Sequence, residues 1–236
     1  MSERLNRFGL SAIFIDAVDG RALSDADKSN YLDLERRSYL PHQLSAGALG
    51  CSLSHLSAWQ ALIASNHNYA LILEDDAELT ASTGAILESL TNGAHQFDII
   101  SLHHRKTRPQ HKIADLHSGH ILSVLRYNHI GATAYLISRD AATRLLKTAL
   151  PITFEIDLYI NRWWQHGVQN LFIYPPLAAE DGRPSTIGYT QTPPSWPNDT
   201  WVSQMHRRLN RLIDSLRKRI GFLRYLQNAQ KTWRVR

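Results

Sequence analysis

Short apolar runs alternate with amphipathic segments along the first 175 residues, a pattern typical of strands that alternate with helices. The pattern predicts strands at residues 10–18, 69–73, 97–102, 132–137 and 171–174. It predicts helices at residues 24–38, with Ser24 as N-cap, and at 52–65, 84–90, 140–150 and 156–166. Residues 44–50 and the histidine-rich stretch 103–120 are predicted to be loops. This order favours an α/β sandwich with a largely parallel sheet.

Charge divides the chain into two parts. Residues 206–236 contain ten Lys or Arg and one acid, Asp214, whereas the other residues contain 16 bases and 20 acids. Apolar residues recur at helical spacing among the bases of this segment, at Leu209, Leu212, Ile213, Leu216, Ile220 and Leu223. We therefore predict a domain at 1–199 and a basic amphipathic helical tail at 200–236, joined through a proline-rich segment at 182–198.

A basic amphipathic helix commonly rests on anionic lipid, so the tail at 201–236 predicts a peripheral contact with a membrane. Two alternatives are a helix that packs its apolar stripe on the body and a helix that binds a protein partner. Nucleic acid is not an expected partner, because no nucleic-acid-binding module accompanies the charge. The single cysteine, the absence of a 20-residue apolar run and the polar N-terminus together favour a cytoplasmic protein.

The candidate chemistry lies at Glu74-Asp75-Asp76, which follows the apolar run 69–73 without a break. Open α/β sheets bind ligands at the carboxyl ends of their strands. A hard divalent cation, Mn²⁺ or Mg²⁺, would relieve the repulsion among three adjacent carboxylates and would neutralise a departing diphosphate. The alternative is an acidic turn that caps the next helix. Cys51 is interpreted as a packed small residue, not as a nucleophile.

Four stretches carry a resemblance to a known family: residues 14–20, 50–55, 71–76 and 131–138. On these stretches the chain resembles glycosyltransferase family 25, the lipooligosaccharide galactosyltransferase group, over about residues 5–190. The resemblance implies a GT-A fold, which is a Rossmann-type mixed or parallel sheet flanked by helices. It also implies a UDP-hexose donor (usually UDP-galactose), a divalent metal, and inversion at the anomeric carbon.

The resemblance also implies roles for individual residues. Asp76 is the expected main metal ligand, assisted by Glu74, with Asp75 assisting or touching the ribose. The residues expected on the donor side are Asp16, Ala17, Asp19, Gly20, Ser52 and His55. The acceptor-side candidates are His129, Gly131 and Glu180. Glu180 follows the last predicted strand, so it could also reach the metal or belong to a plain turn. Asp157 is the candidate base for the acceptor hydroxyl, with Glu155 as the alternative and a helix-capping role for Asp157 left open.

The function expected from these residues is metal-dependent, inverting transfer of a hexose, most simply galactose, to a lipooligosaccharide or other surface glycan. The expected location is the inner face of the inner membrane. Family members open with an apolar strand that this sequence does not contain. Either the start of the sequence is placed too late, which the intact downstream motifs favour, or the chain is a truncated relative. The alternative expectation is therefore a truncated, non-catalytic membrane-peripheral binding protein derived from such an enzyme.

Overall fold

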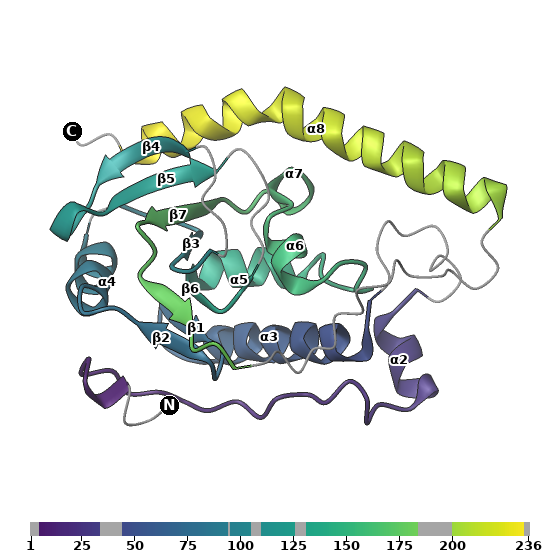
Figure 1. Cartoon of the computed structure of the whole chain (residues 1–236), viewed down its shortest axis with the longest axis horizontal. Helices are drawn as coiled ribbons and strands as arrows, with labels where there is room; N and C mark the ends of the chain where they lie inside the picture. The colour runs from purple at the N-terminus through teal and green to yellow at the C-terminus, as the bar shows by residue number, and fades with distance from the viewer. Residues whose placement is uncertain are drawn as a thin grey trace.

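The fold is known from a computed structural model that describes residues 5–33, 44–93, 95–104, 110–125, 131–183 and 200–233. At its centre is a six-stranded sheet flanked by helices (Figure 1). The strand order is β1 (Tyr69–Leu73), β6 (Ala134–Ser138), β3 (Ile99–Ser101), β7 (Asn170–Tyr174), β5 (Ile121–Leu125) and β4 (Gln110–Asp115). The predicted α/β class is confirmed, but the sheet is mixed: β3 and β7 are parallel, and the other pairs are antiparallel.

Two hydrophobic clusters cover opposite faces of this sheet, because neighbouring residues of a strand point to opposite sides. Ile100 of β3 lies in the cluster that contains residues of α4 (Thr83–Asn92) and α8 (Trp201–Trp233). Ile99 lies in the other cluster, with residues of α3 (Ala46–Ala64), α5 (Arg139–Leu146) and α6 (Ile156–Ile160). The sheet is therefore buried on both faces, and its short apolar strands reflect that burial.

The remaining elements are short. They are α2 (Asp25–Tyr31), α7 (Trp163–His166), the 3-10 turn His117–Gly119, and a separate two-stranded sheet of β2 (Ala77–Leu79) and β8 (Ala178–Glu180). Ser24 caps α2 as predicted: its hydroxyl accepts the Asp27 N–H, and the Asp27 carboxylate accepts the Ser24 N–H. The helix predicted at 156–166 is two helices, α6 and α7, and α7 ends at Gly167 in the left-handed conformation.

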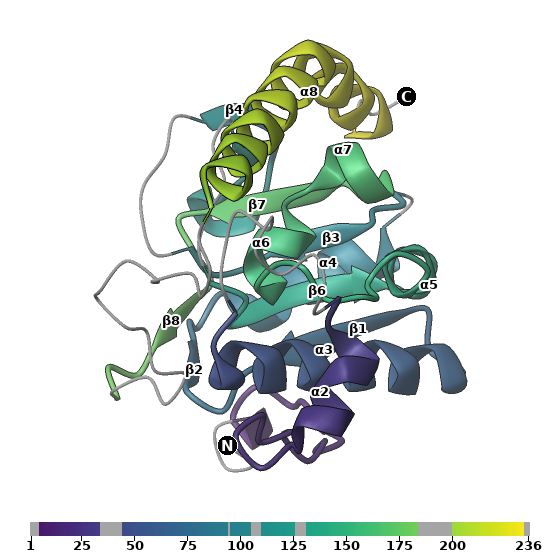
Figure 2. The ribbon, with the colours of Figure 1, turned by 90° about the vertical axis from the view of Figure 1, so that its right-hand side faces the viewer.

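The strand predicted at residues 10–18 is wrong. This segment has no regular secondary structure, and it runs along the side of α3 that faces away from the sheet (Figures 1 and 2). Its apolar residues are exposed, with Ile13 at 82% and Phe14 at 63%. An apolar run becomes a strand only where a neighbouring strand pairs with it, and no described strand lies beside this one.

Two predicted loops are also corrected. Residues 44–50 contain the start of α3, which begins at Ala46 after the N-cap Ser45. Small residues are needed there, because Gly50 packs directly against the Val18–Gly20 backbone. Residues 103–120 include β4, which pairs with β5. A polar edge strand does not show the apolar alternation on which the prediction relied.

The predicted helical tail is α8, a single helix of 33 residues. Its C-terminal half packs on the body, where Tyr225, Ala229 and Trp233 belong to a core cluster. Its other end extends past α6 and α7 (Figure 1). None of the described helices combines the length and the apolar character needed to cross a membrane.

Candidate active site

A tight turn places the three acids directly at the end of β1. The Glu74 N–H donates to the Thr133 carbonyl at 2.9 Å, which continues the β1–β6 pairing by one residue. The Ala77 N–H then donates to the Glu74 carbonyl at 3.2 Å and closes the turn before β2. Glu74, Asp75 and Asp76 therefore lie in one turn at the carboxyl end of β1.

The small β2–β8 sheet adds a fourth acid to this edge. Ala77 pairs with Glu180, and the Asp181 N–H donates to the Asp76 carbonyl at 3.0 Å. Thr133 holds the new acid in place, since its hydroxyl donates to Glu180 Oε1 at 3.2 Å. Glu180, expected on the acceptor side, thus lies beside the acidic turn.

The charged form of Asp76 is disfavoured by its surroundings. Burial raises its pKa above the ordinary value, and the negative charges of Glu74, Glu180 and Asp75 raise it further. Its Oδ1 is buried and has no hydrogen-bond partner in the described part of the chain. A buried carboxylate oxygen without a partner, surrounded by other carboxylates, fits a hard divalent cation with oxygen ligands. Asp76 is the candidate ligand for such an ion, and Glu74 and Glu180 are the neighbouring acids whose charges raise its pKa.

Asp75 points away from this set. Its side chain is 90% exposed, and its Oδ2 forms an ion pair with Arg183 Nη1 at 3.8 Å. Arg183 also donates to the Asp75 carbonyl at 3.0 Å and to Asp181. Arg183 therefore ties the acidic turn to the residues that follow β8.

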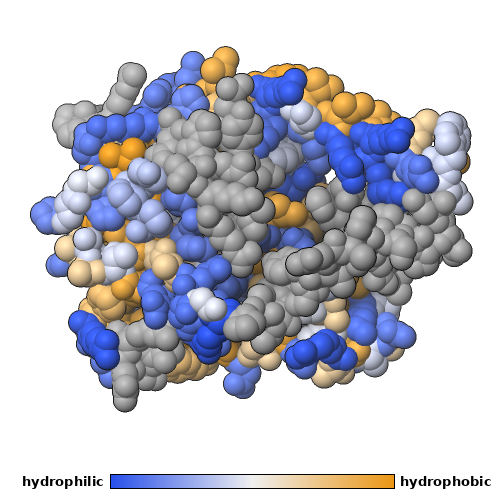
Figure 3. All heavy atoms as spheres, viewed as in Figure 1, coloured by the Kyte–Doolittle hydropathy of each residue, from blue (hydrophilic) through white to orange (hydrophobic). Residues whose placement is uncertain are grey.

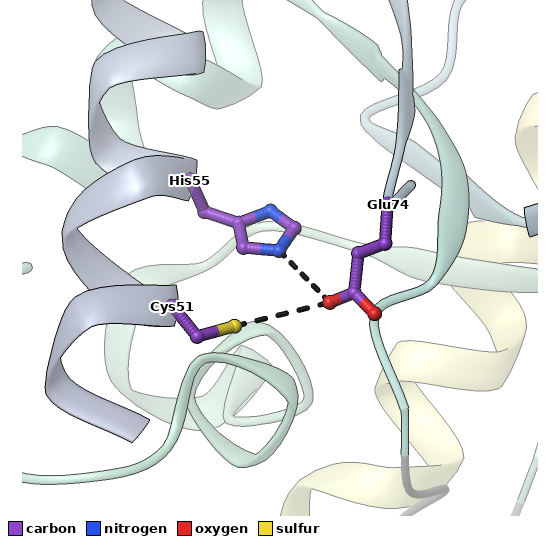
Figure 4. Close-up of side chains that lie close together, drawn as sticks. All are labelled: Cys51, His55 and Glu74. Carbon is purple, nitrogen blue, oxygen red and sulfur yellow. Dashed lines mark hydrogen bonds and ion pairs between the residues drawn. The ribbon is translucent and has the colours of Figure 1, made fainter. Parts of the chain in front are cut away.

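Helix α3 presents two side chains to Glu74 (Figure 4). His55 Nε2 lies 3.3 Å from Glu74 Oε1, and Cys51 Sγ lies 3.8 Å from the same oxygen. The three ligand atoms are within 4.8 Å of one another, so a metal ion could also bind at this group. Residues four apart on a helix lie on one face, which is why Cys51 and His55 reach the same carboxylate.

His55 is in turn held by the core. Its Nδ1 lies 2.8 Å from the Tyr135 hydroxyl, and that hydroxyl accepts the Trp59 indole N–H at 2.9 Å. Because this hydroxyl accepts from Trp59, we assign its one hydrogen to His55 Nδ1, which places the imidazole hydrogen on Nε2, facing Glu74. Burial raises the pKa of Tyr135, so the phenol keeps its proton. We infer a relay from Trp59 through Tyr135 and His55 to Glu74 that fixes the direction of this carboxylate.

Cys51 stays protonated in this setting. Burial raises the pKa of its thiol, and the charges of Glu74, Asp157 and Glu155 raise it further. A thiol held neutral is a poor nucleophile, which agrees with the interpretation of Cys51 as a packed small residue. Glu155 and Asp157 are therefore close enough to Cys51 for their charges to act on its thiol.

The two candidate bases differ in their environment. Asp157 is buried, and each of its oxygens accepts a backbone N–H: Oδ2 from Gly131 at 2.8 Å and Oδ1 from Leu158 at 2.7 Å. Glu155 is the N-cap of α6, and its carboxylate makes no hydrogen bond within the described residues. Burial raises the pKa of Glu155, and the charge of Asp157 adds to this effect. Gly131, at φ 106°, is thus a support for Asp157.

The expected donor-side residues do not gather at the acidic turn. Asp16, Ala17 and Asp19 are exposed on the outer side of α3, and Asp19 is paired with Arg21, which lowers the pKa of Asp19. The others have packing roles: Gly20 contacts α3 at Ala46 and Gly50, and the buried Ser52 hydroxyl donates to the Ala48 carbonyl. Of this group only His55 contacts the acids. His129 lies outside the described residues.

Sequence reasoning did not find Tyr135, Trp59 or Thr133. One signal was present, because Cys51, His55 and Trp59 are spaced four residues apart and share a helix face. The other half of the relay comes from β6, 80 residues after His55. No local pattern indicates that the segment containing Thr133 and Tyr135 pairs with β1.

Comparison with known families identifies the family of the chain. The model of glycosyltransferase family 25, described as an LPS biosynthesis protein family, matches residues 1–160, which is more than half of the chain. The chain belongs to glycosyltransferase family 25. The family match includes the relay, the acidic turn and both candidate bases, and it ends before Glu180.

Curated relatives belong to the same family. The chain is 27% identical over 216 residues to a mouse protein named inactive glycosyltransferase 25 family member 3, covering 81% of this chain and 36% of that protein. It is 25% identical over 228 residues to zebrafish procollagen galactosyltransferase 1, covering 84% of this chain and 37% of that protein. The chain thus spans little more than a third of the length of these relatives. Their names include both an inactive member and a galactosyltransferase, so these names do not decide whether the chain is active.

Proposed function

We propose that this chain is a hexosyltransferase that moves galactose from UDP-galactose to a glycan acceptor with the help of a divalent cation. The observation that carries the proposal is Asp76, whose buried Oδ1 has no partner in the described part of the chain and stands among Glu74 and Glu180. Family membership supports transfer of a sugar, and the name of the zebrafish relative supports galactose.

Asp76, Glu180 and Glu74 are the residues that would hold Mn²⁺ or Mg²⁺. Such an ion would neutralise the negative charge that develops on a departing diphosphate. The relay through His55 directs one Glu74 oxygen toward α3. One Glu74 oxygen is thus held in place before an ion binds.

Glu155 is the residue that we propose as the general base. It removes the proton from the acceptor hydroxyl while that oxygen attacks the anomeric carbon, and the bond to UDP breaks with its electrons staying on the diphosphate. Its raised pKa makes it a stronger base than an ordinary carboxylate, and no hydrogen bond within the described residues occupies it. Asp157, whose two oxygens accept backbone N–H groups, positions the Gly131 turn beside it.

The acceptor that we propose is a lipooligosaccharide or a related surface glycan, assembled at the inner face of the inner membrane. The description of the family as an LPS biosynthesis family supports this choice. The procollagen galactosyltransferase relatives make a protein-linked acceptor the comparison to include in an assay.

The test is hydrolysis of UDP-galactose by the purified chain, with UDP-glucose as a second donor. We expect Mn²⁺-dependent release of UDP, lost by a factor of about 100 or more in Asp76→Asn. Glu78→Gln is the matched control, because Glu78 is an exposed acid on β2 two residues away. Unchanged hydrolysis in Asp76→Asn would contradict the role of Asp76.

A second candidate is a non-catalytic binding protein, and the inactive name of the mouse relative motivates it. It predicts no UDP release from any sugar nucleotide in the presence of Mn²⁺. Transfer or hydrolysis above the level of the Asp76→Asn variant excludes it.

A further inference from the structure

Helix α8 has two apolar faces, and only one of them is covered. On the inner face Tyr225 stacks on Trp163 with ring centres 4.5 Å apart, and its hydroxyl bonds to both the N–H and the carbonyl of Asn170. Ala229 and Trp233 continue this face into the core. These contacts fix the rotation of the helix about its axis, so the direction of every other side chain of α8 is fixed as well.

The opposite face is a stripe of exposed large apolar side chains, here called the outer stripe. They recur at spacings of three and four residues, with exposures from 43% to 80%: Trp201, Val202, Met205, Leu209, Leu212, Leu216, Ile220 and Leu223. Figure 3 shows apolar atoms along the upper edge of the molecule, where α8 runs, with polar atoms beside them. At about 1.5 Å per residue the outer stripe is roughly 33 Å long. An apolar surface of this length on the outside of a protein indicates a partner.

The charges around the outer stripe have one sign. Residues 201–233 contain eight Lys or Arg and one acid, Asp214. Asp214 points to the body, where it accepts hydrogen bonds from Arg162 and from the Trp164 indole N–H. At about 100° per residue, exposed arginines border the stripe on both sides, Arg208 and Arg219 on one and Arg217 and Arg224 on the other.

We propose that the outer stripe of α8 lies in the headgroup region of an anionic membrane, with its apolar side chains inserted and the bordering arginines on lipid phosphates. An amphipathic helix with a narrow apolar face, a basic border and a terminal Trp has the chemistry of a helix that lies in the plane of the interface. The inner face of the same helix then connects the body to the membrane. This inference stands on α8 alone and is independent of sugar transfer.

A second copy of the chain is the other occupant that the three-and-four spacing suits, because that spacing also packs two helices together. Charge argues against it. Two outer stripes in contact would bring arginine borders together, with no acid on either outer face to pair with them. Anionic headgroups supply the missing negative charge, so a lipid surface is the partner that fits both the apolar and the charged residues.

The test is sedimentation of the full chain with vesicles of phosphatidylcholine, with and without about 30% phosphatidylserine. We expect binding to the anionic vesicles, reduced about tenfold or more in Leu212→Glu combined with Ile220→Glu. The matched control is Asn210→Glu combined with Asn228→Glu, which adds the same charge at exposed positions of α8 away from the stripe. Both double variants change exposed side chains only, so their thermal unfolding is expected to match that of the parent chain.

Three results would overturn the proposal. One is equal loss of vesicle binding in the two double variants, because bulk charge alone would then explain the attraction. Another is a lipid-free species of twice 26.8 kDa that the stripe variant converts to a monomer, because a second copy would then cover the stripe. The third is duplex DNA binding at physiological salt without vesicle binding.

Discussion

The His55 imidazole joins the acidic turn to the core: its Nε2 lies 3.3 Å from Glu74 Oε1 and its Nδ1 lies 2.8 Å from the Tyr135 hydroxyl. A histidine whose second nitrogen is held by a buried group has one tautomer and one orientation. Glu74 is thereby positioned by residues of the sheet and of α3, in addition to the turn that carries it.

The relay predicts the effect of removing one oxygen atom. Tyr135→Phe leaves the buried Trp59 N–H and His55 Nδ1 without their shared partner. We therefore expect the free energy of unfolding, measured in urea, to fall by about 1–3 kcal/mol. Tyr174→Phe is the control, because the Tyr174 hydroxyl makes no hydrogen bond within the described residues, and a change within about 0.5 kcal/mol is expected. Equal effects in the two variants would show that the hydroxyl of Tyr135 has no special role.

Asp76 predicts a pH-dependent change in stability. Its raised pKa means that the folded state binds the proton more tightly than the unfolded state, for which the ordinary value is 3.8. Its contribution to stability is therefore least favourable at neutral pH, and it improves as pH falls through the raised pKa toward the ordinary value. In the absence of divalent ions, Asp76→Asn should be more stable than the parent at pH 7, and this difference should shrink on acidification.

Mn²⁺ should make the parent more stable than Asp76→Asn, which is the reverse of the order expected without divalent ions. Binding to the folded state alone raises the thermal midpoint in proportion to the logarithm of the free ion concentration. We expect this rise in the parent and in Glu78→Gln, and none in Asp76→Asn. A rise of the same size in all three proteins would place the ion elsewhere, for example at Cys51, His55 and Glu74.

Glu155 predicts a loss of rate with a defined pH signature. Removing a general base lowers kcat by about 10²–10⁴, so Glu155→Gln should show this loss while KM for the donor stays close to that of the parent. The parent rate should fall on the acid side as Glu155 takes up a proton, at a pH above that of an ordinary carboxylate because its pKa is raised. The opposite result would make Asp157 the base: a rate in Asp157→Asn that is low and no longer falls on the acid side, together with a rate in Glu155→Gln that still falls there.

The contact between Gly20 and Gly50 predicts strong sensitivity to a single methyl group. A methyl on Gly50 would lie 2.2 Å from the Val18 carbonyl oxygen, so Gly50→Ala should destabilise the fold by about 1–3 kcal/mol. Gly84→Ala is the matched control on α4, where a methyl meets no atom within 4 Å, and it should be neutral or stabilise by up to about 1 kcal/mol. Chemical denaturation of the three proteins measures both effects.

The centre of the site was predictable, whereas its surroundings were not. The apolar run 69–73 followed by three acids predicts a strand that ends at a charged turn, and β1 and Glu74 follow that prediction. Strands β2 and β8 have three residues each, which is too short for a periodic signal. The sequence therefore allowed Glu180 to reach the metal or the acceptor but did not predict the β2–β8 pairing that places it beside the acidic turn. Contacts between residues far apart in sequence, such as His55 with Tyr135, leave no local pattern.

Helix α8 shows the same limit in another form. Its helical period is plain from the sequence, but the period alone does not say which face meets the body. The aliphatic residues at 209–223 are the obvious candidates for burial, yet the structure buries Tyr225, Ala229 and Trp233 instead. The Trp163 and Tyr225 rings determine which face of α8 packs on the body, because their stacking and the Asn170 hydrogen bonds exist on one face only.

The central claim is that Asp76 and its neighbouring acids form a cation-dependent nucleotide-sugar site, and calorimetric titration of UDP into the chain tests it most directly. The titration is run with and without Mn²⁺ on the parent, on Glu78→Gln and on Asp76→Asn. We predict binding that requires Mn²⁺ in the first two proteins and no binding in the third. UDP binding that is equal with and without Mn²⁺, or that survives in Asp76→Asn, would contradict the claim.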